Sequence, residues 1–192
     1  VAVARKLTDR PICVSAVEPR KFIPCVDNGA DLVEIGNFDS FYAAGKVFSA
    51  TEVLEITQET RQYLPNTTLS VTVPHTLSLD LQVKLAADLA QAGADIIQTE
   101  GGTSSHPIHP GTLGLIEKAA PTLAAAYEIS RAVDIPVLCA SGLSSVTAPM
   151  AIAAGAAGIG VGSAVNQLNS EVAMIAAVRS LVEALQAVPI KA

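Results

Sequence analysis

Small residues follow two apolar runs near the end of the chain and could bind a phosphate group. Ser141 and Gly142 end one run, and Gly160, Gly162 and Ser163 end the next. Glycine lets backbone N–H groups come close to a ligand, and the N-terminus of a following helix favours an anion. In a (β/α)8 barrel the loops after strands seven and eight often form a phosphate site. These five residues are therefore predicted to hold the phosphate of a phosphorylated small molecule.

Two side chains at predicted strand ends could move a proton. Glu100 stands at the end of an apolar run in the segment TEGG, and His75 follows another run in VPHT. A carboxylate or an imidazole within reach of a substrate can act as general acid or base. We predict both as catalytic residues. The alternatives are a carboxylate hydrogen-bonded to barrel hydroxyl groups for Glu100, and a solvated loop histidine for His75.

Strand alternation selects the polar side chains that should line a pocket. Ser70 and Thr72 alternate with apolar neighbours, and Gln98 alternates with Ile97, so the polar set should face the centre of a barrel. For Glu34, deeper in its strand, a structural role is the alternative. The residues predicted to line the pocket are Glu34, Asn37, Thr72, Gln98, Gly101 and Gly102.

Other reactive side chains receive structural interpretations. His106 and His109 are spaced like a metal-binding pair, but Pro107 and Pro110 should prevent the helix that would align them, so no metal site is predicted. Cys139 should share the inward face of its strand and, in its apolar setting, should be a core residue rather than a nucleophile.

Two loops are candidates for covering the site. The stretch 101–121 contains two histidines and is the longest irregular segment that we predict, and long loops after strands are often lids. The stretch 37–49 carries four aromatic residues and Lys46. Its alternative is a packed loop or one that contacts another subunit. The other lysines lie outside the predicted strand ends, which argues against Schiff-base chemistry.

Strands and helices alternate along the chain, which implies a parallel sheet. The predicted strands are 12–17, 32–35, 67–73, 95–99, 136–140 and 158–161, and the predicted helices are 19–28, 51–63, 79–92, 122–133, 148–154 and 170–186. Ser49 and Glu52 have the spacing of a capping box, and Gly29, Gly93 and Gly155 stand where helices should end.

The three helix-ending glycines mark a repeat. Gly29 and Gly93 each begin Gly-Ala-Asp, Gly155 begins Gly-Ala-Ala, and the spacings are 64 and 62 residues. A period of two βα units suits a closed barrel with an even number of strands. We therefore predict an α/β protein of the TIM (β/α)8 class in which the chain supplies strands three to eight. The two N-terminal units would be missing, and the first residues would be the last turns of a helix.

The composition excludes several classes of protein. At 192 residues the chain is long enough for one domain, 1–192, and no run of residues is long and apolar enough for a membrane span. The net charge of −6 is spread without a basic stripe, so we expect no nucleic-acid partner. Three cysteines without CxxC spacing indicate a reducing, cytoplasmic compartment.

Four segments resemble one family: LVEIGNFDSFY, LSVTVPHTLSLD, DIIQTEGGTSS and CASGLSSVTAPMAIAAGAAGIGVGSAV. They are similar to the family called hypothetical chloroplast reading frame twenty-three, of cyanobacteria and algal plastids. The resemblance implies a TIM barrel of unknown function, longer than this chain, in the cyanobacterial cytosol or plastid stroma. A wider similarity, through Ser141-Gly142 and Gly160 to Ser163, is to barrels that bind phosphate esters or the phosphate of flavin mononucleotide (FMN).

Three functions follow as hypotheses. The first is a lyase, isomerase or synthase that acts on a phosphorylated metabolite. The second is an FMN-binding oxidoreductase, which should be yellow. The third is a non-catalytic metabolite sensor or scaffold, favoured by the scarcity of inward-facing charges. Assembly into a homo-oligomer stays open. The barrel alone cannot choose among them, since it hosts many reactions.

Overall fold

The computed structural model describes residues 1–102 and 105–187. They fall into two compact units, Val1–Gln98 and Thr99–Ala192. In each unit, strands alternate with helices, and every strand pair with an assigned register is parallel. The predicted α/β class is therefore confirmed.

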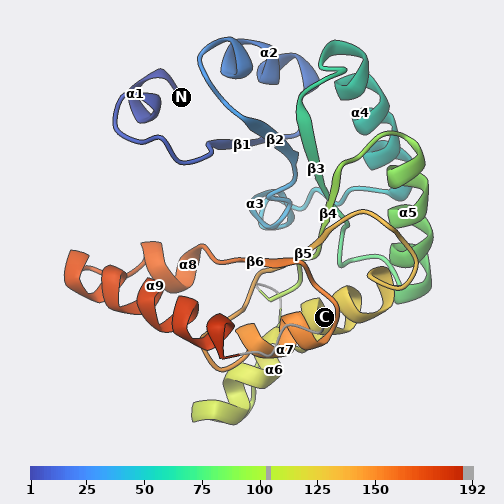
Figure 1. Ribbon diagram of the computed structural model, residues 1–192. Coiled ribbons are helices and arrows are strands. Elements are labelled where there is room, and N and C mark those ends of the chain that lie inside the picture. Colours follow the sequence, from blue (N-terminus) through green and yellow to red (C-terminus); the bar gives the residue numbers. More distant parts are fainter. Residues whose placement is uncertain (103–104, 188–192) are drawn as a thin grey trace. The chain divides into compact units, whose positions relative to one another are not determined.

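Four strands form the sheet of the first unit, side by side in chain order (Figure 1). Glu34 lies beside Ser70, and Thr72 lies beside Gln98, so these side chains share one face of the sheet. The strands are β1 (Cys13–Ala16), β2 (Leu32–Ile35), β3 (Thr68–Thr72) and β4 (Ile96–Gln98).

Helices α2, α4 and α5 pack against β1, β2 and β4 in this unit (Figure 1). Val33, Leu69 and Ile97, on the face opposite the polar residues, are buried. The predicted capping box is confirmed, because Ser49 and Glu52 exchange side-chain and backbone hydrogen bonds at the start of α4. The helices are α1 (Ala2–Arg5), α2 (Pro19–Asp27), α3 (Asp39–Tyr42), α4 (Ala50–Tyr63) and α5 (Leu79–Gln91).

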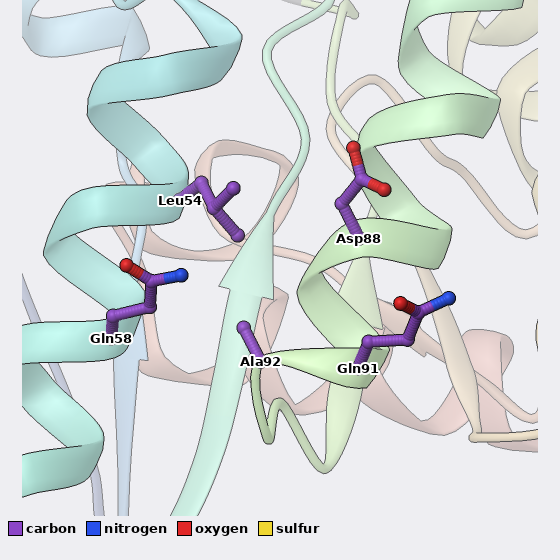
Figure 2. Close-up of a pocket in the computed structure, with 5 residues that line it drawn as sticks. All are labelled: Leu54, Gln58, Asp88, Gln91 and Ala92. Atoms are coloured by element: carbon purple, nitrogen blue, oxygen red, sulfur yellow. The ribbon is translucent and has the colours of Figure 1, made fainter.

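A hollow of about 350 Å³ lies between α4 and α5 (Figure 2). Leu54 and Gln58 of α4 line it together with Asp88, Gln91 and Ala92. None of these is a predicted site residue, so this hollow is separate from the predicted pocket.

The described part of the second unit contains two parallel strands and four helices. Leu138 pairs with Gly158 and Ala140 with Gly160, so both strands end at the same edge. A cluster of buried side chains from α6, β5 and α7 forms its core. The elements are α6 (Gly111–Ile129), β5 (Val137–Ala140), α7 (Ala148–Ala153), β6 (Gly158–Gly160), α8 (Ser163–Asn166) and α9 (Glu171–Gln186).

The prediction for α6 was wrong at its start. The helix begins at Gly111 rather than at 122, so the predicted 21-residue loop ends at Pro110, which caps the helix. Pro121 lies inside the helix, although an interior proline costs about 3 kcal/mol. Burial of Ala119 and Thr122 on either side supplies packing that the local sequence cannot reveal. The end of α6 was also wrong, since it lies at Ile129 rather than at 133. The other predicted bounds agree within one residue, but α3 and α8 were missed.

Cys139 also corrects a prediction. It is fully buried, as expected of a core residue, but its thiol lies against Thr122 of α6 rather than on the inward face. The reason is that Val137 and Cys139 continue the apolar, helix-facing side of β5. Among the described helices, none is long and apolar enough to cross a membrane.

Candidate functional site

A hydrogen-bonded triad joins three of the predicted pocket residues in the first unit. The Thr72 hydroxyl donates to Glu34 Oε1 at 3.2 Å, and the Gln98 amide nitrogen donates both to the same oxygen and to Thr72 Oγ1, the latter at 3.2 Å. Each of these side chains comes from a different strand. The prediction that they share one face of the sheet is therefore confirmed.

Gly36 makes room for this triad. A Cβ atom at Gly36 would lie 2.4 Å from Thr72 Oγ1 and 2.6 Å from the Glu34 carboxylate, closer than real Cβ contacts. Asn37, the next residue, has a φ of 59°, which is the left-handed region that asparagine tolerates. The segment Glu34 to Asn37 thus turns away from the sheet immediately after supplying its carboxylate.

Two more side chains belong to the polar face. Ser70 is 2% exposed, and its hydroxyl has no hydrogen-bond partner among the described residues. Cys13 is a free cysteine on β1. Desolvation and the nearby Glu34 charge raise the pKa of its thiol to about 11, so it is a neutral thiol at physiological pH.

His75 lies next to the short helix α3. Its ring meets the Tyr42 ring edge to face at 5.2 Å, and one of its nitrogens lies within 4.8 Å of an Asp39 carboxylate oxygen. Asp39 and Tyr42 are three residues apart, which puts them on one side of a helical turn. The sequence Asp-Ser-Phe-Tyr at 39–42 has the spacing that would place Asp39 and Tyr42 together on a helix. Because helix α3 was not predicted, this grouping with His75 was not predicted either.

The aromatic loop is packed. The Phe38 and Phe48 rings lie 4.5 Å apart, and both side chains are buried. Lys46 Nζ lies 4.4 Å from the centre of the Phe48 ring, a cation–π contact. This contact agrees with the packed alternative for the loop.

Glu100, in the second unit, is buried, with 5% of its surface exposed. The residue before it, Thr99, belongs to a chain of hydrogen-bonded hydroxyl groups. The hydroxyls of Thr99 and Thr122 lie 2.5 Å apart, and Thr122 donates to the Ala140 carbonyl at 2.6 Å. These bonds connect Thr122 of α6 with Thr99 and with Ala140 of β5, so the residue before Glu100 is hydrogen-bonded to α6.

Close backbone packing explains two of the predicted glycines. A Cβ at Gly102 would lie 2.3 Å from the Gly142 Cα, and one at Gly142 would lie 2.7 Å from the Gly102 Cα. Ser141 and Gly142 both have positive φ, 72° and 75°. Close contact between the two loops therefore explains why positions 102 and 142 require glycine, whether or not a ligand is bound.

Gly162 is different, because a Cβ there would meet nothing within 4 Å. It precedes α8, and Ser163 is the first residue of that helix. Gly160 is the last residue of β6. The predicted phosphate residues on this strand therefore lie on an open turn into a short helix.

His109, the second histidine of the 106/109 spacing, contacts Glu117 of α6. The Glu117 carboxylate accepts from the His109 ring, 2.5 Å away, and from the backbone N–H groups of Ile108 and His109. These contacts lower the pKa of Glu117, and the hydrogen bond with the His109 ring has the largest effect. Glu117 was not singled out from the sequence, since it lies in a stretch predicted as loop.

The structure thus brings some predicted residues together and leaves others apart. Glu34, Thr72 and Gln98 form one cluster in the first unit, and Gly102, Ser141 and Gly142 form another in the second. His75 belongs to the first unit, whereas Glu100, Gly101, Gly160, Gly162 and Ser163 belong to the second.

A solved 3-hexulose-6-phosphate synthase from Salmonella typhimurium resembles this chain in fold. The TM-score is 0.65 with 18% sequence identity, over 96% of this chain and 77% of that one. At this identity the likeness concerns the fold alone, which is that of TIM-barrel enzymes.

Curated relatives establish the family. The chain is 42% identical to the uncharacterized protein ycf23 of Pyropia yezoensis over 171 residues, 89% of this chain and 63% of that protein. It is 46% identical to ycf23 of Cyanophora paradoxa over 173 residues, 90% of this chain and 71% of that protein. The chain therefore spans less than two thirds of the Pyropia protein. The resemblance noted from the sequence is confirmed: residues 1–190 match the proteins of unknown function named DUF561, and the chain belongs to that family.

Proposed function

We propose that the loops after β5 and β6 bind the phosphate of a small metabolite, through Ser141, Gly142, Gly160, Gly162 and Ser163. The observation that carries this proposal is the open turn at Gly162 between β6 and the short helix α8. In TIM barrels, a short extra helix after the eighth strand contributes backbone N–H groups to phosphate. The name of the structural relative, a synthase for a sugar phosphate, supports the same ligand class.

The proposal includes a place in the barrel and a reaction class. The six strands are taken as six of the eight in a TIM barrel, with β5 and β6 as the seventh and eighth. Glu100, buried two residues after the end of β4, is the proposed general acid or base, and His75 is the alternative. A lyase, isomerase or synthase reaction on a phosphate ester would use one such group.

Thermal unfolding of the whole chain with a panel of C3 to C6 sugar phosphates tests the binding. A ligand at 100 times its Kd should stabilise the fold by about 2.7 kcal/mol. Gly162→Leu should abolish that shift without lowering the Tm of the free protein, because the site is open. Gln167→Leu, which adds the same side chain after α8, is the matched control. A panel without any shift, or a shift that survives Gly162→Leu, would refute the phosphate site.

Turnover of a bound sugar phosphate tests the chemistry. Glu100→Gln should lower the rate about 10² to 10⁴-fold while the thermal shift is kept, since loss of a general acid or base has that size. Binding without turnover would identify a sensor. Yellow colour lost in Gly162→Leu would identify an FMN protein instead.

A further inference from the structure

The triad on the first-unit sheet has an ordered direction of hydrogen bonding. The Thr72 hydroxyl and the Gln98 amide nitrogen both donate to Glu34 Oε1, and the Gln98 nitrogen also donates to Thr72 Oγ1. The Gln98 amide must present its nitrogen to the carboxylate, since two facing oxygens would repel. Its carbonyl oxygen is therefore directed away from the triad.

The groups left over are acceptors. Glu34 Oε2 and Gln98 Oε1 accept no hydrogen bond from any residue in the ranges 1–102 and 105–187, whereas Glu34 Oε1 accepts two. Both side chains are only partly buried. A molecule that meets this face must bring hydrogen-bond donors.

Ser70 supplies an independent sign of a ligand. It pairs in register with Glu34, on the same face as Thr72, and its buried hydroxyl is unpartnered within the described part of the chain. Buried polar groups are nearly always hydrogen-bonded, because leaving one unpaired costs free energy. A hydroxyl group can both donate and accept here.

We infer that this face of the first-unit sheet, made by Glu34, Ser70 and Gln98, binds the neighbouring hydroxyl groups of a polyhydroxylated compound. Two hydroxyls can donate to Glu34 Oε2 and Gln98 Oε1, while Ser70 pairs with one of their oxygens. An anion is disfavoured by the carboxylate. A cation is less suited than a hydroxyl, because the carboxylate charge is already shared by two donors on Oε1. The inference does not depend on the phosphate site.

Cys13 offers a reporter for this face. Its thiol is near enough to Glu34 to feel the carboxylate charge, yet the residue is exposed, whereas Cys139 is buried. A ligand on Glu34 should shield Cys13 from an alkylating reagent. Mass spectrometry of the peptides separates its reaction from that of Cys25.

The experiment measures alkylation of Cys13 by iodoacetamide in the whole chain at about pH 9, where more of this thiol is ionised and able to react, with ribitol as the polyhydroxylated probe. Ribitol should slow the reaction at least threefold, and saturation-transfer NMR should detect its binding. Inorganic phosphate, magnesium chloride and 1,4-diaminobutane are the comparison probes and should not protect. Absence of any ribitol effect would overturn the inference, and so would stronger protection by magnesium or the diamine.

Variants make the test specific. Glu34→Gln should remove protection by ribitol, and Asp88→Asn, a carboxylate on α5 paired with Lys84, should keep it. Ser70→Ala removes an unpaired hydroxyl, so it should fold at least as well as the parent and bind ribitol about tenfold more weakly. Unchanged ribitol affinity in Ser70→Ala would count against the site even if Glu34→Gln failed to fold.

Discussion

Both units contain the same glycine turn between the end of a helix and the next strand, but different side chains surround it in each unit. In each, a helix ends at a glycine with positive φ, 95° at Gly29, 98° at Gly93 and 102° at Gly155. Two residues later the backbone N–H donates to the start of another strand, from Asp31 to Ile12, from Asp95 to Leu69, and from Ala157 to Val137. The backbone arrangement is therefore repeated three times.

Within the ranges 1–102 and 105–187, an arginine side chain joins this turn in the first unit and not in the second. Arg61 donates to the Gly93 carbonyl, to three carbonyls between 64 and 67, and to the Asp95 carboxylate at 2.8 Å. Asp95 also accepts from the Leu69 N–H at 2.8 Å. Arg5 and Asp31 repeat this arrangement at β1, where Arg5 makes fewer hydrogen bonds than Arg61 and its bonds to carbonyl oxygens are longer.

The second unit uses small residues in the same place. Ser130 donates to the Ala154 carbonyl at 3.0 Å, and Ala157 stands where the first unit has an aspartate. Alanine cannot accept the strand N–H. The comparison shows that the glycine turn defines the connection, while the side chains determine how strongly the start of each strand is held.

Removing Arg61 should have the largest effect on this comparison. Arg61→Ala leaves several carbonyls and Asp95 without their donor, and we expect a loss of about 3 kcal/mol in the free energy of unfolding. Chemical denaturation measures it, with the exposed Arg179→Ala as control. Arg5→Ala should cost less, since two of its bonds are 3.3 and 3.4 Å long. Equal losses for Arg61 and Arg179 would show that the arrangement is not stabilising.

Adding the missing carboxylate should have a smaller effect of opposite sign. Ala157→Asp gives the second unit an acceptor for the Val137 N–H, in the position that Asp95 has toward Leu69. We expect about 0.5 to 1 kcal/mol of stabilisation, the net value of one hydrogen bond. Chemical denaturation of the parent protein and of Ala157→Asp under the same conditions measures the difference in the free energy of unfolding. A destabilised variant would mean that the two turns are not equivalent.

The pH dependence should be the smallest effect. The hydrogen bond from the Ile12 backbone N–H lowers the pKa of Asp31 below its ordinary value of 3.8, and the Arg5 charge lowers it further by a smaller amount. A lowered folded-state pKa means that the stabilisation is complete above pH 3.8 and is lost as the pH falls through the folded-state value. Asp31→Asn should therefore flatten the stability curve below about pH 4. An unchanged acid limb in that variant would show that Asp31 contributes nothing there.

These turns lie at the starts of the strands, whereas the candidate sites lie at the strand ends or on a strand face. In barrel enzymes the ends of the strands carry chemistry, and the starts carry stability. Substitutions at Arg61 or Asp31 should consequently alter unfolding, while Glu34, Ser70 and Gly162 should alter binding.

Local patterns predicted much of the architecture. Alternation of apolar and polar residues located all six strands within one residue, and the glycines marked the ends of α2, α5 and α7. The same alternation placed Glu34, Thr72 and Gln98 on one face. These features could be predicted because each depends on neighbours within a few residues.

The sequence by itself determined the order of strands and helices, the turn glycines and the polar face of the first-unit sheet. Only the tertiary structure decided the start of α6, the partners of Arg5 and Arg61, and the contact between Gly102 and Gly142. It also decided that Gly162 stays open while Gly142 is needed for packing. The physical reason is that the contacts of Arg5 with Gly29, of Arg61 with Gly93 and of Gly102 with Gly142 join groups 24, 32 and 40 residues apart in the chain, whose approach no local pattern records.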